Sequence, residues 1–166
     1  MKVVQGGLLG GSGFFIPSLV SAKADPSVVF IFPTVRFSLL TPRMVRIEIN
    51  PEGQFEDRPS QTFWHRRQPV PDARIQFGEK YLTIETDHLE LTYRDSRKGF
   101  SSQNLKVKIK ETDRLVRLDE VNPGCFPGTT RTLDGADGSV ELQPGVVSRN
   151  GWVQLEDTAS LVFNES

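Results

Sequence analysis

The sequence of 166 residues is poor in the side chains that cross-link small proteins or bind metals. It contains one cysteine, Cys125, and two histidines, His65 and His88. A single cysteine excludes an intrachain disulfide, and the set is too small for a zinc-finger pattern. We therefore predict no disulfide framework, no metal and no cofactor. Cys125 is interpreted as a small, partly buried residue rather than a nucleophile.

The chain also lacks an excess of charge of one sign. Twenty basic and twenty-one acidic residues give a formal net charge of −1. Nucleic-acid-binding domains are usually basic, because phosphate contacts supply much of their affinity. The balance argues against a nucleic-acid partner. The basic stretch 65–67, next to Phe63 and Trp64, is interpreted as a loop whose aromatic side chains pack down while its charges stay solvated.

Long apolar runs are missing as well, so no helix is expected to span a membrane and no membrane partner is predicted. The first 26 residues contain a weakly apolar stretch that glycines and Pro17 interrupt, and Ala22-Lys23-Ala24 fits a signal cleavage site. Residues 1–26 are left open between a loose arm and a secretory signal. The location of the protein is likewise left open between cytoplasmic and secreted. The dinucleotide-binding glycine spacing is absent, because Gly11-Ser12-Gly13 is followed by Phe14-Phe15-Ile16, with no glycine at position 16.

Strand patterns, in contrast, run through most of the chain. In segment 44–50 the apolar residues alternate with Arg46, Glu48 and Asn50, which predicts a half-buried strand with one wet face. The other predicted strands are 28–32, 35–40, 74–77, 81–85, 89–93, 105–110 and 151–157.

No convincing amphipathic helix interrupts these strands, and prolines and glycines separate them. Strands without helical crossovers cannot form a parallel sheet. The sequence therefore predicts an all-β fold, an antiparallel β-sandwich, as one domain over residues 27–166. The span 119–149 shows little strand pattern. Loops of that length are usually functional or disordered.

The glycine-rich segment GTTRTLDGADGS, residues 128–139, invites two chemical interpretations that fail on spacing. A phosphate-binding P-loop ends in Gly-Lys-Ser/Thr before a helix, and this segment does not. An EF-hand needs a glutamate at its twelfth position, which is Gly145 when the count begins at Asp134. A catalytic carboxylate pair is not selected either, because spacing alone favours no pair among 21 acids.

Two longer runs carry a family resemblance. The first is VRFSLLTPRMVRIEINPEGQFEDRPSQTFWHRR, residues 35–67. The second begins with GTTRTLD at Gly128, passes through SRNGW at 148–152 and ends with Glu156-Asp157-Thr158. Together they resemble the N-terminal region of glycoside hydrolase family 31, the α-glucosidase and α-xylosidase family. The resemblance covers about residues 28–160, with both runs in the family's order.

This resemblance implies a galactose-mutarotase-like β-sandwich that is followed in the parent enzyme by a catalytic (β/α)₈ barrel. The parent reaction is retaining hydrolysis of an α-glucoside or α-xyloside. The family's Trp-x-Asp-Met-Asn-Glu-like nucleophile motif does not occur in these 166 residues. We therefore expect no catalytic residue and no turnover from this chain alone. Its implied partners are the barrel and, through the parent enzyme, a carbohydrate substrate; an isolated sandwich is expected to self-associate.

The resemblance also implies a substrate-binding loop. In the family a loop from the sandwich helps to wall the barrel's pocket, and by position Arg131 and Asp134 belong to it. Asp134 would hydrogen-bond sugar hydroxyls and Arg131 would orient it through a bidentate pair. The alternative is that both residues only hold the shape of the loop. This chain departs from the family by carrying two prolines in segment 122–127, where Asn-Leu-Gly or Asn-Leu-Lys is usual.

Two competing functions remain. A free-standing carbohydrate-binding module would stack sugar rings on Trp64 and Trp152, although such residues are more often core residues. A mutarotase-like enzyme would need a His and Glu acid-base pair. The two histidines lie in or beside loop-like segments with no evident acidic partner in the sequence, so we rank the mutarotase-like enzyme last.

Overall fold

A computed structural model describes residues 23–96, 99–120, 122–128, 135, 137–142 and 144–163. The chain divides into two compact units. Unit 1 joins the described residues up to Arg117 with those from Glu156 onward, and unit 2 comprises Leu118–Leu155. Each unit is described by itself below. The domain boundaries predicted from the sequence, 1–26 and 27–166, stay a prediction.

Unit 1 begins with a short sheet. A 3-10 turn, η2 (Pro26–Val28), leads into this sheet, and Asp25 caps the turn by accepting a 3.0 Å hydrogen bond from the Ser27 amide. The sheet has the order β1-β2-β3, and both pairs are antiparallel. Its strands are β1 (Val29–Ile31), β2 (Val35–Thr41) and β3 (Met44–Ile49).

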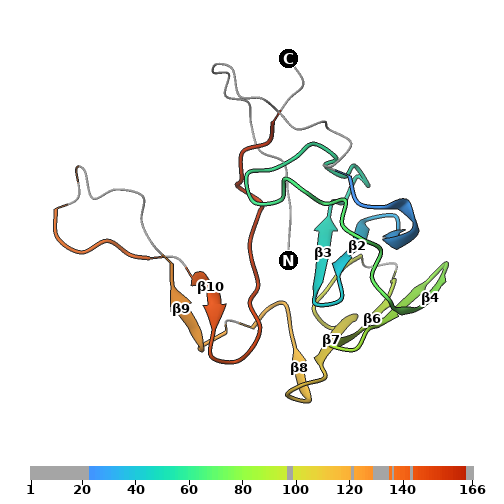
Figure 1. Ribbon diagram of the computed structural model, residues 1–166. Coiled ribbons are helices and arrows are strands. Elements are labelled where there is room, and N and C mark those ends of the chain that lie inside the picture. The colour runs from blue at the N-terminus through green and yellow to red at the C-terminus, as the bar shows by residue number, and fades with distance from the viewer. Residues whose placement is uncertain are drawn as a thin grey trace. The chain divides into compact units, whose positions relative to one another are not determined.

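The second sheet of unit 1 is a five-stranded antiparallel meander in chain order (Figure 1). Its strands are β4 (Arg74–Gly78), β5 (Tyr81–Glu85), β6 (Leu89–Arg94), β7 (Leu105–Ile109) and β8 (Arg114–Val116). Short turns join β4 to β5 and β5 to β6, as the glycine and polar residues between these apolar runs predicted, whereas the longer segment 95–104 joins β6 to β7. The three-residue strand β8 was not predicted, because it is too short to show a period.

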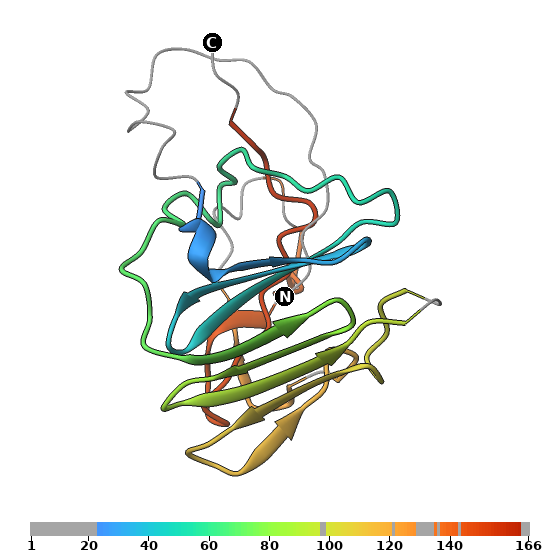
Figure 2. The ribbon, with the colours of Figure 1, turned by 90° about the vertical axis from the view of Figure 1, so that its right-hand side faces the viewer.

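The two sheets of unit 1 pack face to face, as the view in Figure 2 shows. Phe37 of β2 and Tyr93 of β6 are fully buried, and their ring centroids lie 4.9 Å apart. Phe32 contacts the same tyrosine ring at 4.9 Å. Each apolar side chain buried in this way contributes about 1.5–3 kcal/mol to folding. The predicted antiparallel all-β sandwich is confirmed at this level.

The other face of the three-stranded sheet is not wet. Arg46 and Glu48 of β3 are only 1% and 2% exposed, so the prediction of a solvated face was wrong. Irregular chain from segments 53–68 and 156–163 lies over this face in Figure 2, and these segments contribute the buried Arg66 and Asp157. An irregular segment has no hydrophobic period, so the sequence does not predict that these two segments cover the sheet.

Unit 2 holds a two-stranded antiparallel ribbon, β9 (Cys125–Pro127) and β10 (Pro144–Ser148). Both strands lie in the span that showed little strand pattern. The strand predicted at 151–157 does not form, since this segment has no ladder partner in the described chain. Among the described residues no helix is long and apolar enough to cross a membrane.

Candidate functional site

The two residues predicted to bind sugar, Arg131 and Asp134, lie outside the described residues. Their role stays a prediction. Gly135 and Gly138, which are described, have φ values of +74° and +92°. No atom lies within 4 Å of the position that a Cβ would take at either residue. Backbone conformation, and not lack of space, therefore favours glycine at these two positions of the loop.

The ribbon brings together the two ends of segment 128–143, called here the loop. Pro127 of β9 pairs with Pro144 of β10, and Cys125 pairs with Ser148, with a register shift between the two pairs. The loop thus leaves and returns at paired positions of an antiparallel ladder. A loop closed by such a ladder has fewer accessible conformations than a free segment of equal length.

A buried asparagine fastens the base of the ribbon. The Asn122 side chain donates from Nδ2 to Ser148 Oγ at 2.9 Å and to the Trp152 carbonyl at 2.5 Å. Its Oδ1 accepts from Asn150 Nδ2 at 2.7 Å and from the Gly124 amide at 2.9 Å. Asn122 is 8% exposed, and these bonds use both of its polar atoms. We call this set of contacts the Asn122 junction.

The Asn122 junction lies in segment 122–127, which contains two prolines. A Cβ on Gly124 would sit 2.6 Å from the side chain of Asn150, so glycine is required there for close approach. Arg149 adds a cation-π contact, with its guanidinium carbon 4.9 Å from the centre of the Phe126 ring. Sequence reasoning missed Asn122. Asn-Pro-Gly signals a turn, but nothing in it points to partners near residue 150.

The two tryptophans proposed as sugar platforms are both half-buried. Trp64 packs against Phe163, with ring centroids 4.4 Å apart and planes tilted by 50°. Next to it, Phe63 is 8% exposed. The aromatic side chains next to the basic stretch 65–67 therefore pack against the protein, as expected.

The strands β2 and β3 carry a group of buried charges that belong to the first motif run. Arg36 donates to both carboxylate oxygens of Glu48, at 2.5 and 2.9 Å, and to Asp57 Oδ1 at 2.6 Å. Burial disfavours the charged guanidinium, yet the hydrogen bonds with Glu48 and Asp57 raise the pKa of Arg36 above its ordinary value. The pKa of Asp57 is lowered, since its bonds with Arg36 and Lys23 outweigh its own desolvation.

Arg66 is buried in the same region, which corrects the expectation that this stretch keeps its charges solvated. It is 3% exposed and donates to three backbone carbonyls, those of Phe63, Glu56 and Arg58. Burial lowers its pKa to about 10. The guanidinium thus supplies fixed donors to an irregular segment that has no ladder of its own. The neighbouring Arg67 is exposed, as predicted.

The two motif runs meet at Ser60. Its hydroxyl donates to Asp157 Oδ2 at 2.8 Å and accepts from the Phe63 amide at 3.0 Å. Ser60 also forms a β-bridge with Val162, and the Phe163 amide donates to the Pro59 carbonyl at 2.9 Å. We call the buried set that results the polar layer. It consists of Arg36, Arg46, Glu48, Ser60, Arg66 and Asp157.

One histidine has the acidic partner that the sequence did not reveal. His88 Nδ1 lies 2.6 Å from Glu111 Oε1, and Arg43 Nη1 lies 3.2 Å from the same oxygen. The pairing of Leu89 with Ile109 brings the turns before β6 and after β7 together. The expectation of no partner was therefore wrong for His88. The His88–Glu111 contact lies at the surface, and Arg43 supplies the counter-charge of Glu111, so the contact is a surface hydrogen bond between two turns.

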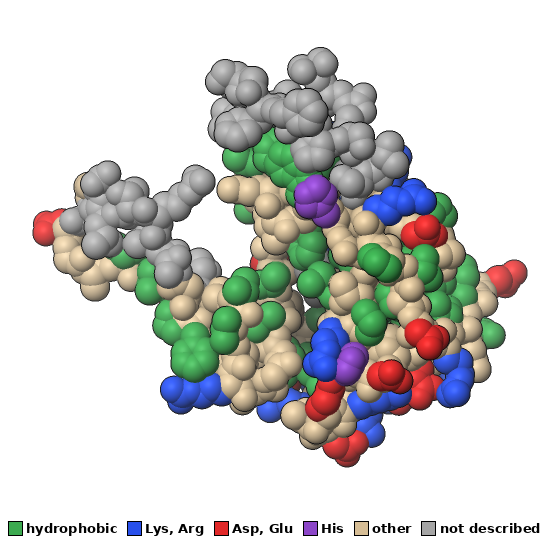
Figure 3. All heavy atoms as spheres, viewed as in Figure 1, with side chains coloured by type: hydrophobic (Ala, Val, Ile, Leu, Met, Phe, Trp, Pro, Cys, Tyr) green, Lys and Arg blue, Asp and Glu red, His purple; other side chains and the backbone are tan. Residues whose placement is uncertain are grey.

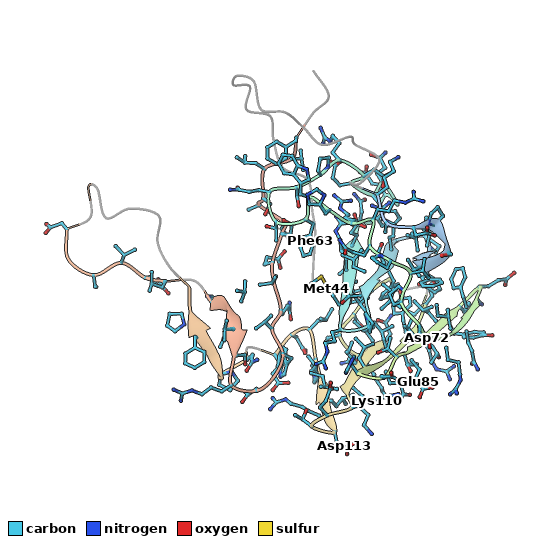
Figure 4. The ribbon with its side chains drawn as sticks, viewed as in Figure 1. Met44, Phe63, Asp72, Glu85, Lys110 and Asp113 are labelled. Atoms are coloured by element: carbon cyan, nitrogen blue, oxygen red, sulfur yellow. The ribbon has the colours of Figure 1, made fainter. Side chains whose placement is uncertain are left out.

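Charges elsewhere on unit 1 are paired across strands. Lys110 lies 2.9 Å and Arg74 2.8 Å from Glu85, and Figure 4 shows Glu85 and Lys110 close together. On the face seen in Figure 3, acidic and basic side chains intermingle and do not gather by sign. Within the described part of the chain, no group of three His, Cys, Asp or Glu residues could hold a metal ion.

The described residues thus define an antiparallel all-β protein with a buried polar layer in unit 1 and a loop-bearing ribbon in unit 2. No family model matches the chain. No curated protein matches it either.

Proposed function

We propose that this chain is the N-terminal, non-catalytic region of a glycoside hydrolase family 31 enzyme, with a galactose-mutarotase-like sandwich. Its work there is to support a C-terminal (β/α)₈ barrel and to lend the loop to the binding of an α-glucoside or α-xyloside. The chain supplies no nucleophile or acid of its own. Active sites of such barrels lie at the C-terminal face of their strands.

The observation that carries the proposal is the polar layer. Ser60 and Asp157 come from the two separate runs that resemble the family, and the 2.8 Å hydrogen bond joins them. The layer also takes Arg36, Arg46 and Glu48 from the first run. Buried charges need specific partners, so a chain that uses this layer must keep both runs together. The need of these buried charges for partners would be the physical reason why both runs recur together in the family.

The way in which the ribbon holds the two ends of the loop supports the proposed role of the loop. The ladder of β9 and β10 joins its two ends, and the Asn122 junction fixes the base of the ribbon. A binding loop is more effective when a rigid element holds its ends, because less conformational entropy is lost on binding. The ribbon gives the loop this kind of support.

The coding sequence downstream of Ser166 tests the proposal directly. A reading frame that continues into a barrel with the Trp-x-Asp-Met-Asn-Glu-like motif is the expected result. The purified 166-residue chain should show no turnover of p-nitrophenyl α-glucoside or α-xyloside. Clear turnover by this chain, with the Asp134→Asn variant equally active, would overturn the proposal.

A kinetic prediction follows for the enzyme that contains the barrel. Asp134→Asn removes a charged hydrogen-bond acceptor, which is worth about 1.5–3 kcal/mol, so kcat/KM should fall by about 10- to 100-fold. Asp137→Asn makes the same chemical change three residues further along the loop and serves as the control, with little expected effect. Equal kcat/KM values for the two variants would assign Asp134 to loop shape alone.

The alternative is a free-standing carbohydrate-binding module that uses Trp64 or Trp152. Calorimetric titration of the chain with maltose and with xylo-oligosaccharides separates the two functions. Saturable binding that is lost in Trp152→Ala or Trp64→Ala supports the module. Absence of heat with both sugar series supports the region of a larger enzyme, in which the barrel completes the pocket.

A further inference from the structure

Asn150 is followed directly by Gly151, and this is the one Asn-Gly pair in the sequence. In such a pair the backbone nitrogen of the glycine can attack the side-chain carbonyl carbon of the asparagine, because glycine has no side chain that hinders the approach. Asn50 and Asn122 precede prolines, whose nitrogen has no hydrogen to lose. The two remaining asparagines precede leucine and glutamate, whose side chains crowd the nitrogen. The sequence thus offers one favourable position for this reaction.

The structure leaves the glycine of this pair open to solvent. Gly151 is exposed and has a φ of +74°, a backbone conformation that favours glycine. Apart from its chain neighbours, no residue places an atom within 4 Å of the position that a Cβ would take there. Base from the solvent therefore reaches Gly151, whose amide must lose its proton before it can act as a nucleophile.

The Asn150 carboxamide, in contrast, is held in the Asn122 junction. Its Nδ2 donates to Asn122 Oδ1 at 2.7 Å, and the Asn150 backbone amide donates to Ser148 Oγ at 3.0 Å. The side chain also packs closely on Gly124, where a Cβ would lie 2.6 Å from Asn150 Cγ. These contacts restrict rotation of the side chain. Attack by the Gly151 nitrogen is therefore expected to require local opening of the junction.

We propose that Asn150-Gly151 is a site of spontaneous deamidation and that the Asn122 junction controls its rate. The deprotonated Gly151 nitrogen forms a bond with Asn150 Cγ, and the Nδ2 group takes up a proton and leaves as ammonia. The product is a cyclic succinimide. Water then adds to either imide carbonyl carbon, and the C–N bond at that carbon breaks. The residue at position 150 becomes aspartate or isoaspartate, with one water consumed and one ammonia released.

The reaction breaks the junction, because the product cannot donate. A carboxylate oxygen replaces the Nδ2 donor and faces the Oδ1 acceptor of Asn122, where the 2.7 Å hydrogen bond was. The Nδ2 of Asn122 already donates to Ser148 and to the Trp152 carbonyl, so it cannot turn toward the carboxylate without losing these bonds. Deamidation is therefore a one-way change that loosens the base of the ribbon. It is independent of the proposed enzymatic role.

Peptide mapping by mass spectrometry, after incubation of the full chain at mildly alkaline pH, tests the site. Conversion at Asn150 should be slow in the folded chain and faster in urea, where the junction is absent, while Asn50 stays intact in both. Absence of conversion at Asn150 in urea would exclude the site. Equal rates in the folded and the urea-unfolded chain would show that the junction does not control the reaction.

The variant Asn122→Ala tests the control by the junction. Loss of the acceptor should raise the rate of conversion in the folded chain by about 5- to 100-fold, since a buried hydrogen-bond partner is lost and opening becomes easier. Asn104→Ala is the matched control. It removes an asparagine that bonds to Gly99 and Ser101 in unit 1, and it should leave the rate unchanged. An unchanged rate in Asn122→Ala, or an equal rise in both variants, would overturn the proposed control.

The effect of the product on the ribbon is measured with Asn150→Asp, which needs no incubation. Hydrogen exchange at the β10 amides should be faster than in wild type, while the amides of β5 and β6 stay protected. Asn150→Ala removes the donor without adding a second acceptor, and it should accelerate exchange less. Exchange in β10 that is unchanged in Asn150→Asp would show that deamidation does not loosen the ribbon.

Discussion

At the scale of single residues, burial separates side chains that look alike in the sequence. Arg43 and Arg46 lie three positions apart on the same hairpin, and both have an acidic partner. The Arg43 side chain is 66% exposed, whereas that of Arg46 is 1% exposed. Exposed ion pairs contribute about 0–1 kcal/mol, whereas breaking a buried pair from one side leaves an uncompensated charge. The same residue type therefore has very different energetic weight.

Removing the charge of Arg46 should destabilise the protein strongly. Arg46→Met leaves Glu48 and Asp157 with fewer counter-charges inside the polar layer, and we expect a loss of about 3–5 kcal/mol in the free energy of unfolding. Urea denaturation of both variants measures this. Arg43→Met, the matched exposed change, should cost no more than about 1 kcal/mol. Similar midpoints for the two variants would show that the polar layer adds nothing specific.

At the scale of elements, strands were predicted well where one sheet face is apolar. Tyr81–Glu85 was predicted with both boundaries, because alternation and flanking turns agree there. The ribbon of β9 and β10 was missed, and residues 151–157 were predicted as a strand that does not form. A two-stranded ribbon is marginally stable by itself. Side-chain contacts such as the Asn122 junction stabilise it, and these leave no periodic signal in the sequence.

Loss of the Asn122 junction should loosen the ribbon without unfolding the large sheet. In Asn122→Ala the Gly124 and Asn150 donors lose their acceptor, at a cost of about 1–3 kcal/mol. Hydrogen exchange should therefore accelerate at the β10 amides by about 5- to 100-fold, while β5 and β6 stay protected. Gln103→Ala, which changes an exposed amide, is the control. Unchanged exchange in β10 would assign ribbon stability to something other than Asn122.

At the scale of the whole molecule, acid should unfold the protein through its paired carboxylates. Hydrogen bonds with Arg58 lower the pKa of Glu56. The pKa of Glu111 is lowered by a hydrogen bond from its own backbone amide and then by its hydrogen bond with His88. The pKa of Asp57 is lowered as well, although burial of its carboxylate acts in the opposite direction. Because these pKa values are lower in the folded protein, the carboxylates of the unfolded chain bind protons at a higher pH than those of the folded protein. Stability is then fully present above the unfolded values near 4 and is lost as pH falls through the folded pKa values.

The pH dependence of a single variant checks this sign. Asp57→Asn should be less stable than wild type at pH 7, because Arg36 and Lys23 lose an ionised partner. The difference should shrink as pH falls below about 4 and vanish where Asp57 is protonated in both states of the wild type. Thermal unfolding from pH 7 to pH 2.5 measures both curves. A difference that grows toward acid pH would contradict the assigned shift.

The isolated chain should also associate with itself, because unit 2 exposes apolar side chains on both sides of its ribbon. Val146 and Val147 are 70% and 59% exposed, and neighbouring residues of a strand face opposite sides. Light scattering should show an apparent mass that rises with concentration. The nearly isosteric double change Val146→Thr with Val147→Thr should reduce that rise. A sharp wild-type monomer at high concentration would count against this prediction.

The sequence by itself determined the all-β class and seven of its strands, because alternation of apolar and polar residues follows directly from the pleat of a strand. It also determined that no disulfide closes the fold, since there is a single cysteine. Only the tertiary structure decided that Arg46, Glu48 and Arg66 are buried, that His88 meets Glu111, and that Ser60 holds Asp157. These contacts join irregular or distant segments. Their partners are set by where the chain turns in space, which no local spacing of residues encodes.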